Sequence, residues 1–340
     1  MTRSLPIIIA LLAVSAAGCG GKRAPALARY ETTREMMGTF VTVTLWCDSD
    51  ERAAAAGEAA FAVIARLEAM MSIHRGDSEI SEVNRTAAAR PVAVSDDLLA
   101  VLKQSLHYAE LSGGAFDITM APLGKLWRDA AAAGQPPSSE DIAAVLPLIG
   151  WDKVKLDEEH KTVRFERPGM ALDLGGIAKG YAADRALAEL KRQGIGSAMV
   201  NAGGNIAASG TPPDSPGWRV AMQKPGASRG ERLPETVLLN EAGVSTSGDY
   251  ERYVEIGAKR YSHIIDPRSG LPVERMSGVT VISPDATSAD ALSTACSVLG
   301  PAEGLKLVAT LPGVEVMYVV MEDSGPAVAK SPGFDGRLAH

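Results

Sequence analysis

The residues best suited to bind a charged ligand lie in the stretch ALDLGGIAKGY, residues 171–181. Gly175 and Gly176 carry no Cβ, so the backbone there can come close to a ligand. A helix is expected to begin directly after them, and its N-terminus together with Lys179 would attract an anion such as phosphate. Asp173 offers a carboxylate for a ribose hydroxyl, a base nitrogen or a metal. The stretch matches neither of the common phosphate-loop patterns, so a plain strand-to-helix turn with a capping Asp is the competing interpretation.

A second group of oxygen-bearing side chains stands at the start of an expected helix near residue 288. Asp290 and Thr294 are four residues apart, so both lie on one face of that helix. Carboxylate and hydroxyl oxygens are ligands that suit Mg²⁺ or Ca²⁺. The competing interpretation is an Asp that complements the helix dipole, together with an ordinary helical Thr.

Further segments place hydrogen-bonding side chains beside glycines or an aromatic ring: VNAGGN at 200–205, GVSTSG at 243–248 and AFDITMAPL at 115–123. Each also has the composition of an ordinary turn or helix end. His263 is one of five histidines and the only one inside a dense polar motif. Imidazole titrates near neutral pH, which suits a group that orients or accepts a proton.

Hydrophobic periodicity predicts the elements that hold these side chains. Alternation over residues 36–46 indicates a strand, and helical spacing indicates helices over 51–71, from Ser95 to Gly113, and over about 176–193. A hairpin is expected over 153–167, with later strands at 198–201, 218–223, 236–240, 278–282 and 315–320, and helices at 288–299 and 301–311. Because helices and hairpins are interleaved without steady strand–helix–strand alternation, the chain is expected to be α+β with a mostly antiparallel sheet and packed helices.

Composition restricts the class of protein. The chain of 340 residues is 46% hydrophobic and 22% charged, which is typical of a globular protein. Its net charge is -7 and no cluster of Lys and Arg is present, so nucleic acid is not expected as a partner. Cys47 and Cys296 are expected to be buried thiols, and no Cys/His set has zinc spacing.

The first residues have the pattern of a bacterial lipoprotein signal. A short positive start precedes an apolar run over 5–14, and small residues lead directly to Cys19. We expect 1–18 to be the signal peptide, Cys19 to be lipidated and 19–30 to be a flexible tether. The competing interpretation is an ordinary secretory signal with an incidental cysteine.

Taken together and in this order, eight motifs resemble the ApbE family, which comprises FAD:protein FMN transferases that are often exported lipoproteins. The motifs are Met37-Gly38-Thr39, Ser78-Glu79-Ile80-Ser81 with Asn84, Phe116-Asp117-Ile118-Thr119, Asp173-Leu174-Gly175-Gly176-Ile177-Ala178-Lys179-Gly180, Asn201-Ala202-Gly203-Gly204-Asn205, Ser245-Thr246-Ser247-Gly248, His263-Ile264-Ile265-Asp266-Pro267 and Ala289-Asp290-Ala291-Leu292-Ser293-Thr294. The resemblance covers residues 31–325 and leaves 326–340 as a C-terminal tail.

The resemblance implies a single domain related to the T-fold, with an FAD cleft between two subregions. It implies FAD as substrate and Mg²⁺ as cofactor, with the carbonyl of Gly176, Asp290 and Thr294 as metal ligands. Contacts with FAD would come from Met37, His74, Ala115, Phe116, Asp117, Asp173, Lys179 and Ile264. His74 stands where many members carry a stacking Tyr, and Ser293 stands where some carry a second Asp.

The implied reaction is transfer of FMN from FAD to a Ser or Thr hydroxyl of an exported electron-transfer subunit, with release of AMP. Asp290 would act through the metal, and His263 is the candidate for orienting or deprotonating the acceptor hydroxyl. The expected location is the bacterial cell envelope, with a lipid anchor in a membrane and the domain on its periplasmic or extracytoplasmic side. Two alternatives stay open: a Mg²⁺-dependent FAD pyrophosphatase, and a non-catalytic FAD-binding lipoprotein.

Overall fold

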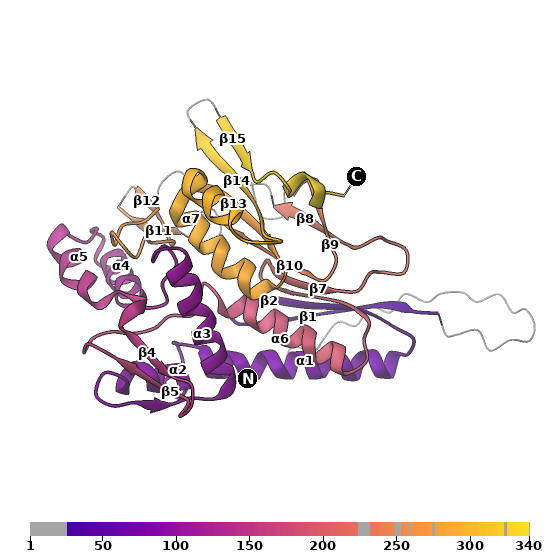
Figure 1. Ribbon diagram of the computed structural model, residues 1–340, viewed down its shortest axis with the longest axis horizontal. Coiled ribbons are helices and arrows are strands. Elements are labelled where there is room, and N and C mark those ends of the chain that lie inside the picture. The colour runs from indigo at the N-terminus through magenta and orange to yellow at the C-terminus, as the bar shows by residue number, and fades with distance from the viewer. Residues whose placement is uncertain are drawn as a thin grey trace, which may run out of the picture.

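An eight-stranded antiparallel sheet forms the centre of the fold, in the strand order β1-β2-β6-β7-β10-β13-β14-β15 (Figure 1). The computed structural model describes residues 26–223, 232–248, 253–257, 259–273, 276–322 and 325–339. The predicted signal peptide and Cys19 therefore lie outside the described residues. The strands of this sheet are β1 (Ala28–Met36), β2 (Thr39–Cys47), β6 (Ser197–Ala202), β7 (Asn205–Ser209), β10 (Ala242–Ser247), β13 (Met276–Ser283), β14 (Glu315–Glu322) and β15 (Gly325–Lys330).

Three helices, α1 (Asp50–Met71), α6 (Ala178–Arg192) and α7 (Ala286–Ala309), cover one face of this sheet (Figure 1). α6 packs on β6 and β7, and α7 packs on β10 and β13. Alternate residues of the strands point toward these helices, as Val41, Val43 and Leu45 of β2 do in the main core. The sheet and its helices thus bury one continuous apolar layer.

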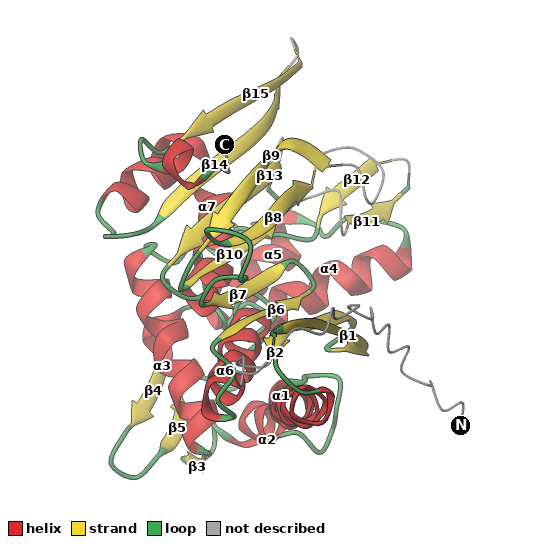
Figure 2. Ribbon diagram, turned by 90° about the vertical axis from the view of Figure 1, so that its right-hand side faces the viewer, coloured by secondary structure: helices red, strands yellow, loops and turns green. Residues whose placement is uncertain are grey.

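The hairpin of β8 (Trp218–Gln223) and β9 (Arg232–Leu239) lies with the opposite face of the sheet (Figure 2). Trp218 and Val237 of this hairpin pack with Val244 and Val319 of the sheet in a second apolar cluster. Phe334, in the short helix η3 (Phe334–Arg337), is fully buried in the same cluster.

The remaining elements form two smaller groups at the edge of the helical layer. α2 (Glu79–Thr86) and α3 (Asp96–Leu111) lie with a three-stranded sheet of β3 (Val92–Ala93), β5 (Thr162–Phe165) and β4 (Val154–Asp157). α4 (Ala121–Ala133) and α5 (Ser139–Val145) lie with the hairpin of β11 (Tyr253–Ile256) and β12 (Lys259–Ser262) (Figure 1). The one-turn helices η1 (Leu146–Leu148) and η2 (Trp151–Lys153) connect α5 to β4.

The predicted fold class is confirmed: all pairings between named strands in the described residues are antiparallel. The two helices predicted at 288–299 and 301–311 are the two parts of α7, which are separated by a kink at Gly300, whose φ of 71° is not helical. None of the helices in the described part of the chain is long and apolar enough to cross a bilayer.

The fold extends beyond the range 31–325 at both ends. β1 begins at Ala28, inside the predicted tether, and β15 with Phe334 occupies the predicted tail. Both are edge strands, so each pairs with only one neighbouring strand of the sheet. In β1 every second residue is exposed and the sequence ARYETTREM is largely polar, so its hydrophobic pattern is weak.

Candidate active site

α6 and α7 bring together two motifs that lie 110 residues apart along the chain. The N–H of Gly180 donates to Oδ2 of Asp290 at 2.9 Å. One turn earlier, a Cβ added to Gly176 would lie 3.2 Å from Oγ1 of Thr294, so the Gly176 backbone directly faces that hydroxyl. A Cβ on Gly180 would lie only 2.2 Å from the carbonyl oxygen of Ala286. Glycine at this position therefore permits the close approach of the helices that places Gly176, Asp290 and Thr294 side by side.

Asp290 is a buried carboxylate at this contact, with 4% of its surface exposed. Burial raises its pKa above the usual range, although the charge of Lys179 and the N–H of Gly180 act in the opposite direction. The Thr294 hydroxyl donates to the backbone carbonyl of Asp290 at 3.2 Å. A bound cation would favour the ionised carboxylate and so offset the cost of burying it.

A buried cluster of hydroxyl and amide groups lies behind Asp290 and joins the sheet to α7. Oγ of Ser293 lies 3.0 Å from Oγ of Ser245 and 2.8 Å from Oγ of Ser247. Ser293 also donates to the carbonyl of Asp290 at 2.9 Å, and Ser245 donates to Oδ1 of Asn205 at 2.6 Å. The VNAGGN and GVSTSG segments therefore converge on the helix that carries Asp290, and Ser293 in this chain connects that helix to β10.

Asp173 and Phe116 border the same site from two adjoining segments. The N–H of Asp173 donates to the carbonyl of Ile118 at 2.7 Å, so the two segments run beside each other. Oδ1 of Asp173 accepts from the N–H of Gly175 at 2.9 Å, which shapes the turn before α6. A Cβ on Gly176 would lie 3.2 Å from Cε2 of Phe116, so this ring contacts the turn directly.

Asp117, predicted to contact FAD, uses both of its carboxylate oxygens for hydrogen bonds inside the protein, and its contact with FAD stays a prediction. Oδ1 accepts from the N–H and the hydroxyl of Thr119 at 2.8 and 2.7 Å, and Oδ2 accepts from the N–H of Trp151 at 2.9 Å. Burial raises its pKa despite these bonds. The Asp117 carboxylate holds the 115–120 loop in place and is turned toward that loop. Its neighbour Ala115, predicted to contact FAD, is fully buried.

Met37 stands in a tight turn next to a second such turn. Met37 and Gly38 have φ of 53° and 67° and join the paired residues Met36 and Thr39. The adjacent turn at Gly203 and Gly204 leads into Asn205, and the N–H of Gly203 donates to the carbonyl of Phe40 at 3.1 Å. A methionine at positive φ is uncommon, and such strain often marks a functional position.

His263 and Ile264 lie on the loop between β12 and β13, and His263 is exposed. The carbonyl of Ile264 accepts from the N–H of Val273 at 2.9 Å. Farther along the same loop, Trp127 Nε1 of α4 donates to the carbonyl of Gly270 at 2.9 Å. Cγ of Arg268 lies 3.8 Å from the Cβ position of Gly114, so this loop packs beside the one that leads to Phe116.

His74 lies in the exposed turn after α1, where its backbone N–H donates to Oγ of Ser72 at 3.3 Å. Its predicted stacking on a flavin stays a prediction. Asn84, part of the second sequence motif but given no role there, fixes the backbone directly before Asp173. Asn84 Nδ2 donates to the carbonyl of Leu172 at 2.9 Å, and Asn84 Oδ1 accepts from the N–H of Leu172 at 2.7 Å. The sequence signal was present, because Asn84 stands close to the Ser78-Glu79-Ile80-Ser81 motif.

The atoms of Gly176, Asp290 and Thr294 that could coordinate a metal ion at the α6–α7 contact are all oxygens. Across the described ranges, no cluster of three or more His, Cys, Asp or Glu residues could hold a metal ion. One carboxylate with hydroxyl and carbonyl oxygens is instead a set suited to a hard cation such as Mg²⁺, which keeps water or substrate phosphates as its other ligands.

The chain is similar to known proteins over most of its length. A model of the ApbE family matches residues 37–318. An FAD:protein FMN transferase of Klebsiella pneumoniae is 33% identical over 291 residues, covering 85% of this chain and 89% of that protein. Another from Escherichia coli is 31% identical over 342 residues, covering 97% of both. The crystal structure of the Pseudomonas stutzeri flavinyl transferase ApbE superposes with a TM-score of 0.81 at 32% identity, covering 92% of this chain and 97% of that one.

Proposed function

The chain belongs to the ApbE family, and from this we propose that it is an FAD:protein FMN transferase, an enzyme that moves FMN from FAD onto an acceptor protein. The observation that carries the proposal is the contact of α6 with α7, which places Gly176, Asp290 and Thr294 together. The relatives at 31–33% identity that carry this name match nearly the whole described chain, so the likeness is not confined to one motif.

Mg²⁺ is the metal that this donor set fits, held by the carboxylate of Asp290, the hydroxyl of Thr294 and the carbonyl of Gly176. Support comes from the oxygen-only chemistry and from the buried carboxylate, whose raised pKa a cation would lower. Bound there, Mg²⁺ would supply a Lewis acid for the pyrophosphate oxygens of FAD.

Residues of the chain would hold and orient the reacting groups. Lys179 lies in the first turn of α6 with its Nζ 3.0 Å from the carbonyl of Gly175, and its charge suits the FAD phosphates. The acceptor's Ser or Thr oxygen would bond to the FMN-side phosphorus while the bond from that phosphorus to the bridging oxygen breaks, and AMP leaves. We assign His263 to accept the hydroxyl proton, since it lies on an exposed loop that an acceptor protein can reach.

The mass of an acceptor protein tests this function. The mature protein is mixed with FAD, Mg²⁺ and an acceptor domain, and the acceptor is weighed intact by mass spectrometry. An increment equal to FMN is expected with the wild type and should be lost in Asp290→Asn. Asp285→Asn provides a matched control, because Asp285 caps the same helix by accepting from the N–H of Ser288 and lies outside the donor set.

The same experiment separates the other functions. Free FMN and AMP without any change in acceptor mass would show an FAD pyrophosphatase, which the same site could perform with water as the acceptor. FAD that stays intact under all conditions would show a flavin-binding protein without transferase activity. Either result would overturn the proposed transfer.

We also propose that Cys19 carries a lipid that anchors the domain on the extracytoplasmic side of a bacterial membrane. The support is the sequence alone: an apolar run over 5–14 followed by small residues and Cys19. Cys19→Ser should move the protein from the membrane fraction to the soluble extracytoplasmic fraction. A variant that stays in the membrane fraction would contradict the anchor.

A further inference from the structure

Asp184 connects the same two helices at the end of their contact that is remote from the proposed metal site. Along α6, Gly176, Gly180 and Asp184 are spaced four residues apart, and they face Thr294, Asp290 and the start of α7 in turn. The helices therefore run antiparallel, and contacts at one end fix the alignment at the other. Asp184 provides the last of these contacts.

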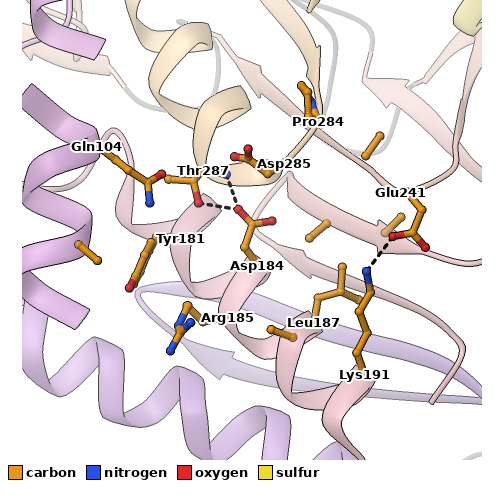
Figure 3. A pocket seen from close by; sticks show the side chains of 15 residues that line it. Gln104, Tyr181, Asp184, Arg185, Leu187, Lys191, Glu241, Pro284, Asp285 and Thr287 are labelled. Carbon is orange, nitrogen blue, oxygen red and sulfur yellow. Dashed lines mark hydrogen bonds and ion pairs between the residues drawn. The ribbon is translucent and has the colours of Figure 1, made fainter. Parts of the chain in front are cut away.

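The carboxylate of Asp184 binds the first residues of α7 through three hydrogen bonds. Oδ1 accepts from the N–H of Ala286 at 2.9 Å. Oδ2 accepts from the N–H and the hydroxyl of Thr287 at 2.7 and 2.5 Å (Figure 3). Helix N-terminal N–H groups need acceptors, and a side chain usually supplies one from within the same segment. Here Asp285 caps α7 locally, and Asp184 adds a second cap from a different helix.

The surroundings of Asp184 do not favour a charged group. Asp184 lines a cavity of about 410 Å³ together with Asp285 and Glu241, and this cavity includes none of Gly176, Asp290 or Thr294 (Figure 3). Burial, with a smaller effect of the nearby Asp285 charge, raises the pKa of Asp184 to about 6, even though Thr287 and Ala286 donate to it. Because all three of its partners are donors, only a side chain with two acceptor oxygens can make every one of these hydrogen bonds, and a carboxylate provides both.

We propose that Asp184 is a positioning residue that sets the alignment of α7 against α6 and thereby the separation between the Gly176 carbonyl and the oxygens of Asp290 and Thr294. The inference rests on the metal site proposed above. Without the Asp184 contact, α7 loses the hydrogen bonds that fix its first residues to α6, and Asp290, one turn farther along α7, is expected to shift relative to Gly176. The predicted consequence is weaker metal binding at a distance from the substituted side chain.

Asp184→Asn and Asp285→Asn form a matched pair for this test. Each removes one negative charge from the N-terminus of α7 and keeps nearly the same shape. In Asp184→Asn, one carboxylate oxygen is replaced by an NH₂ group that faces the donors of Ala286 or Thr287, which removes at least one of the three hydrogen bonds between the helices. Asp285→Asn leaves every contact with α6 in place.

Metal binding is measured with Mn²⁺ in place of Mg²⁺, at pH 8 with FAD present, by the electron paramagnetic resonance signal of free Mn²⁺. Asp184→Asn should bind Mn²⁺ about tenfold more weakly than the wild type, which is the smaller end of the loss seen when a group that orients metal ligands is removed. Asp285→Asn should stay within about twofold of the wild type. Equal affinities for the wild type and Asp184→Asn, or equal losses in the two variants, would overturn the proposal.

Hydrogen exchange of the Gly180 amide, measured without any metal, tests the role of Asp184 in helix alignment independently of metal binding. Because that N–H donates to Asp290, its protection reports the alignment of the helices. Faster exchange of Gly180 is expected in Asp184→Asn and not in Asp285→Asn. If the wild type binds no Mn²⁺, the metal proposal fails, and this exchange still decides whether Asp184 sets the alignment. Unchanged protection in Asp184→Asn would overturn the positioning role.

Discussion

Gly180→Ala tests whether α6 and α7 must pack as closely as they do. The added Cβ would lie 2.2 Å from the carbonyl oxygen of Ala286 and 2.8 Å from the Cβ of Asp290. Non-bonded heavy atoms are most stable at separations of about 3.5–4.0 Å, so the helices would have to separate by roughly 1 Å. Overpacking of this kind destabilises a well-packed core by about 1–3 kcal/mol.

Gly57→Ala is the matched control, because Gly57 lies inside α1 and no atom lies within 4 Å of its Cβ position. Without a clash, the change from glycine to alanine stabilises a helix interior by about 0.5–1 kcal/mol. The two substitutions are chemically identical and both lie in helices, so the unfolding free energies of the two variants should differ by the overpacking cost of about 1–3 kcal/mol.

Urea denaturation followed by circular dichroism measures the stability, and the rate of FMN transfer to an acceptor domain measures the function. A displacement of about 1 Å among reacting groups costs about 100-fold in rate, which is the loss expected for Gly180→Ala. Gly57→Ala should keep the wild-type rate. If Gly180→Ala is as stable as the wild type and transfers FMN at the same rate, the close approach of the helices does not build the site.

Further predictions concern a pH dependence and two local structures. The pKa of Asp184 is about 6 in the folded state, above its usual 3.8, so the folded state holds an extra proton between these pH values. The unfolding free energy should therefore fall by at most about 3 kcal/mol as pH rises from about 4 to about 6. Chemical denaturation of the wild type should show this decrease, and an equally steep decrease in Asp184→Asn would contradict the assignment to Asp184. Asp117→Ala should lower the unfolding free energy by about 3 kcal/mol, because it leaves the buried donors of Thr119 and Trp151 without an acceptor; an unchanged urea midpoint would contradict the loop-holding role. Met37→Gly should raise the unfolding free energy by about 1 kcal/mol by relieving the positive φ and should weaken FAD binding in a flavin fluorescence titration; unchanged FAD affinity would remove Met37 from the contacts with FAD.

The sequence predicted the fold class and most elements because their periodicities are strong. α1 was expected over 51–71 and spans Asp50–Met71, and the strand expected at 218–223 is β8. The edge strands β1 and β15 were missed, because β1 is polar on both faces and β15 is a six-residue segment, GPAVAK, that exposes Val328, so neither alternates clearly.

Within the site, the sequence identified residues that belong to local motifs, but it could not predict contacts that depend on the order of the strands in the sheet. Asp290 and Thr294 share a helix face and can be recognised by their spacing alone. The contact among Ser245, Ser293 and Asn205 exists because β10 pairs with β7 beneath α7, which no local pattern specifies.

Asp117 and Asp184 show why a carboxylate's role cannot be read from its neighbours in sequence. The sequence could not show that the oxygens of Asp117 bond to Thr119 and Trp151, the second of which lies 34 residues away in the chain. Asp184, in the middle of a helical pattern, has the sequence context of a solvent-facing residue and instead binds the start of another helix. Orientation depends on the packing of elements that lie far apart in the chain.

The position of a metal ion in a crystal of the protein grown with FAD and Mn²⁺ tests the proposed active site most directly. The anomalous signal of Mn²⁺ is predicted between the Asp290 carboxylate, the Thr294 hydroxyl and the Gly176 carbonyl, in contact with the FAD pyrophosphate. FAD bound with Mn²⁺ at another place, or with no Mn²⁺ beside Asp290, would contradict the claim that the contact of α6 with α7 is the active site.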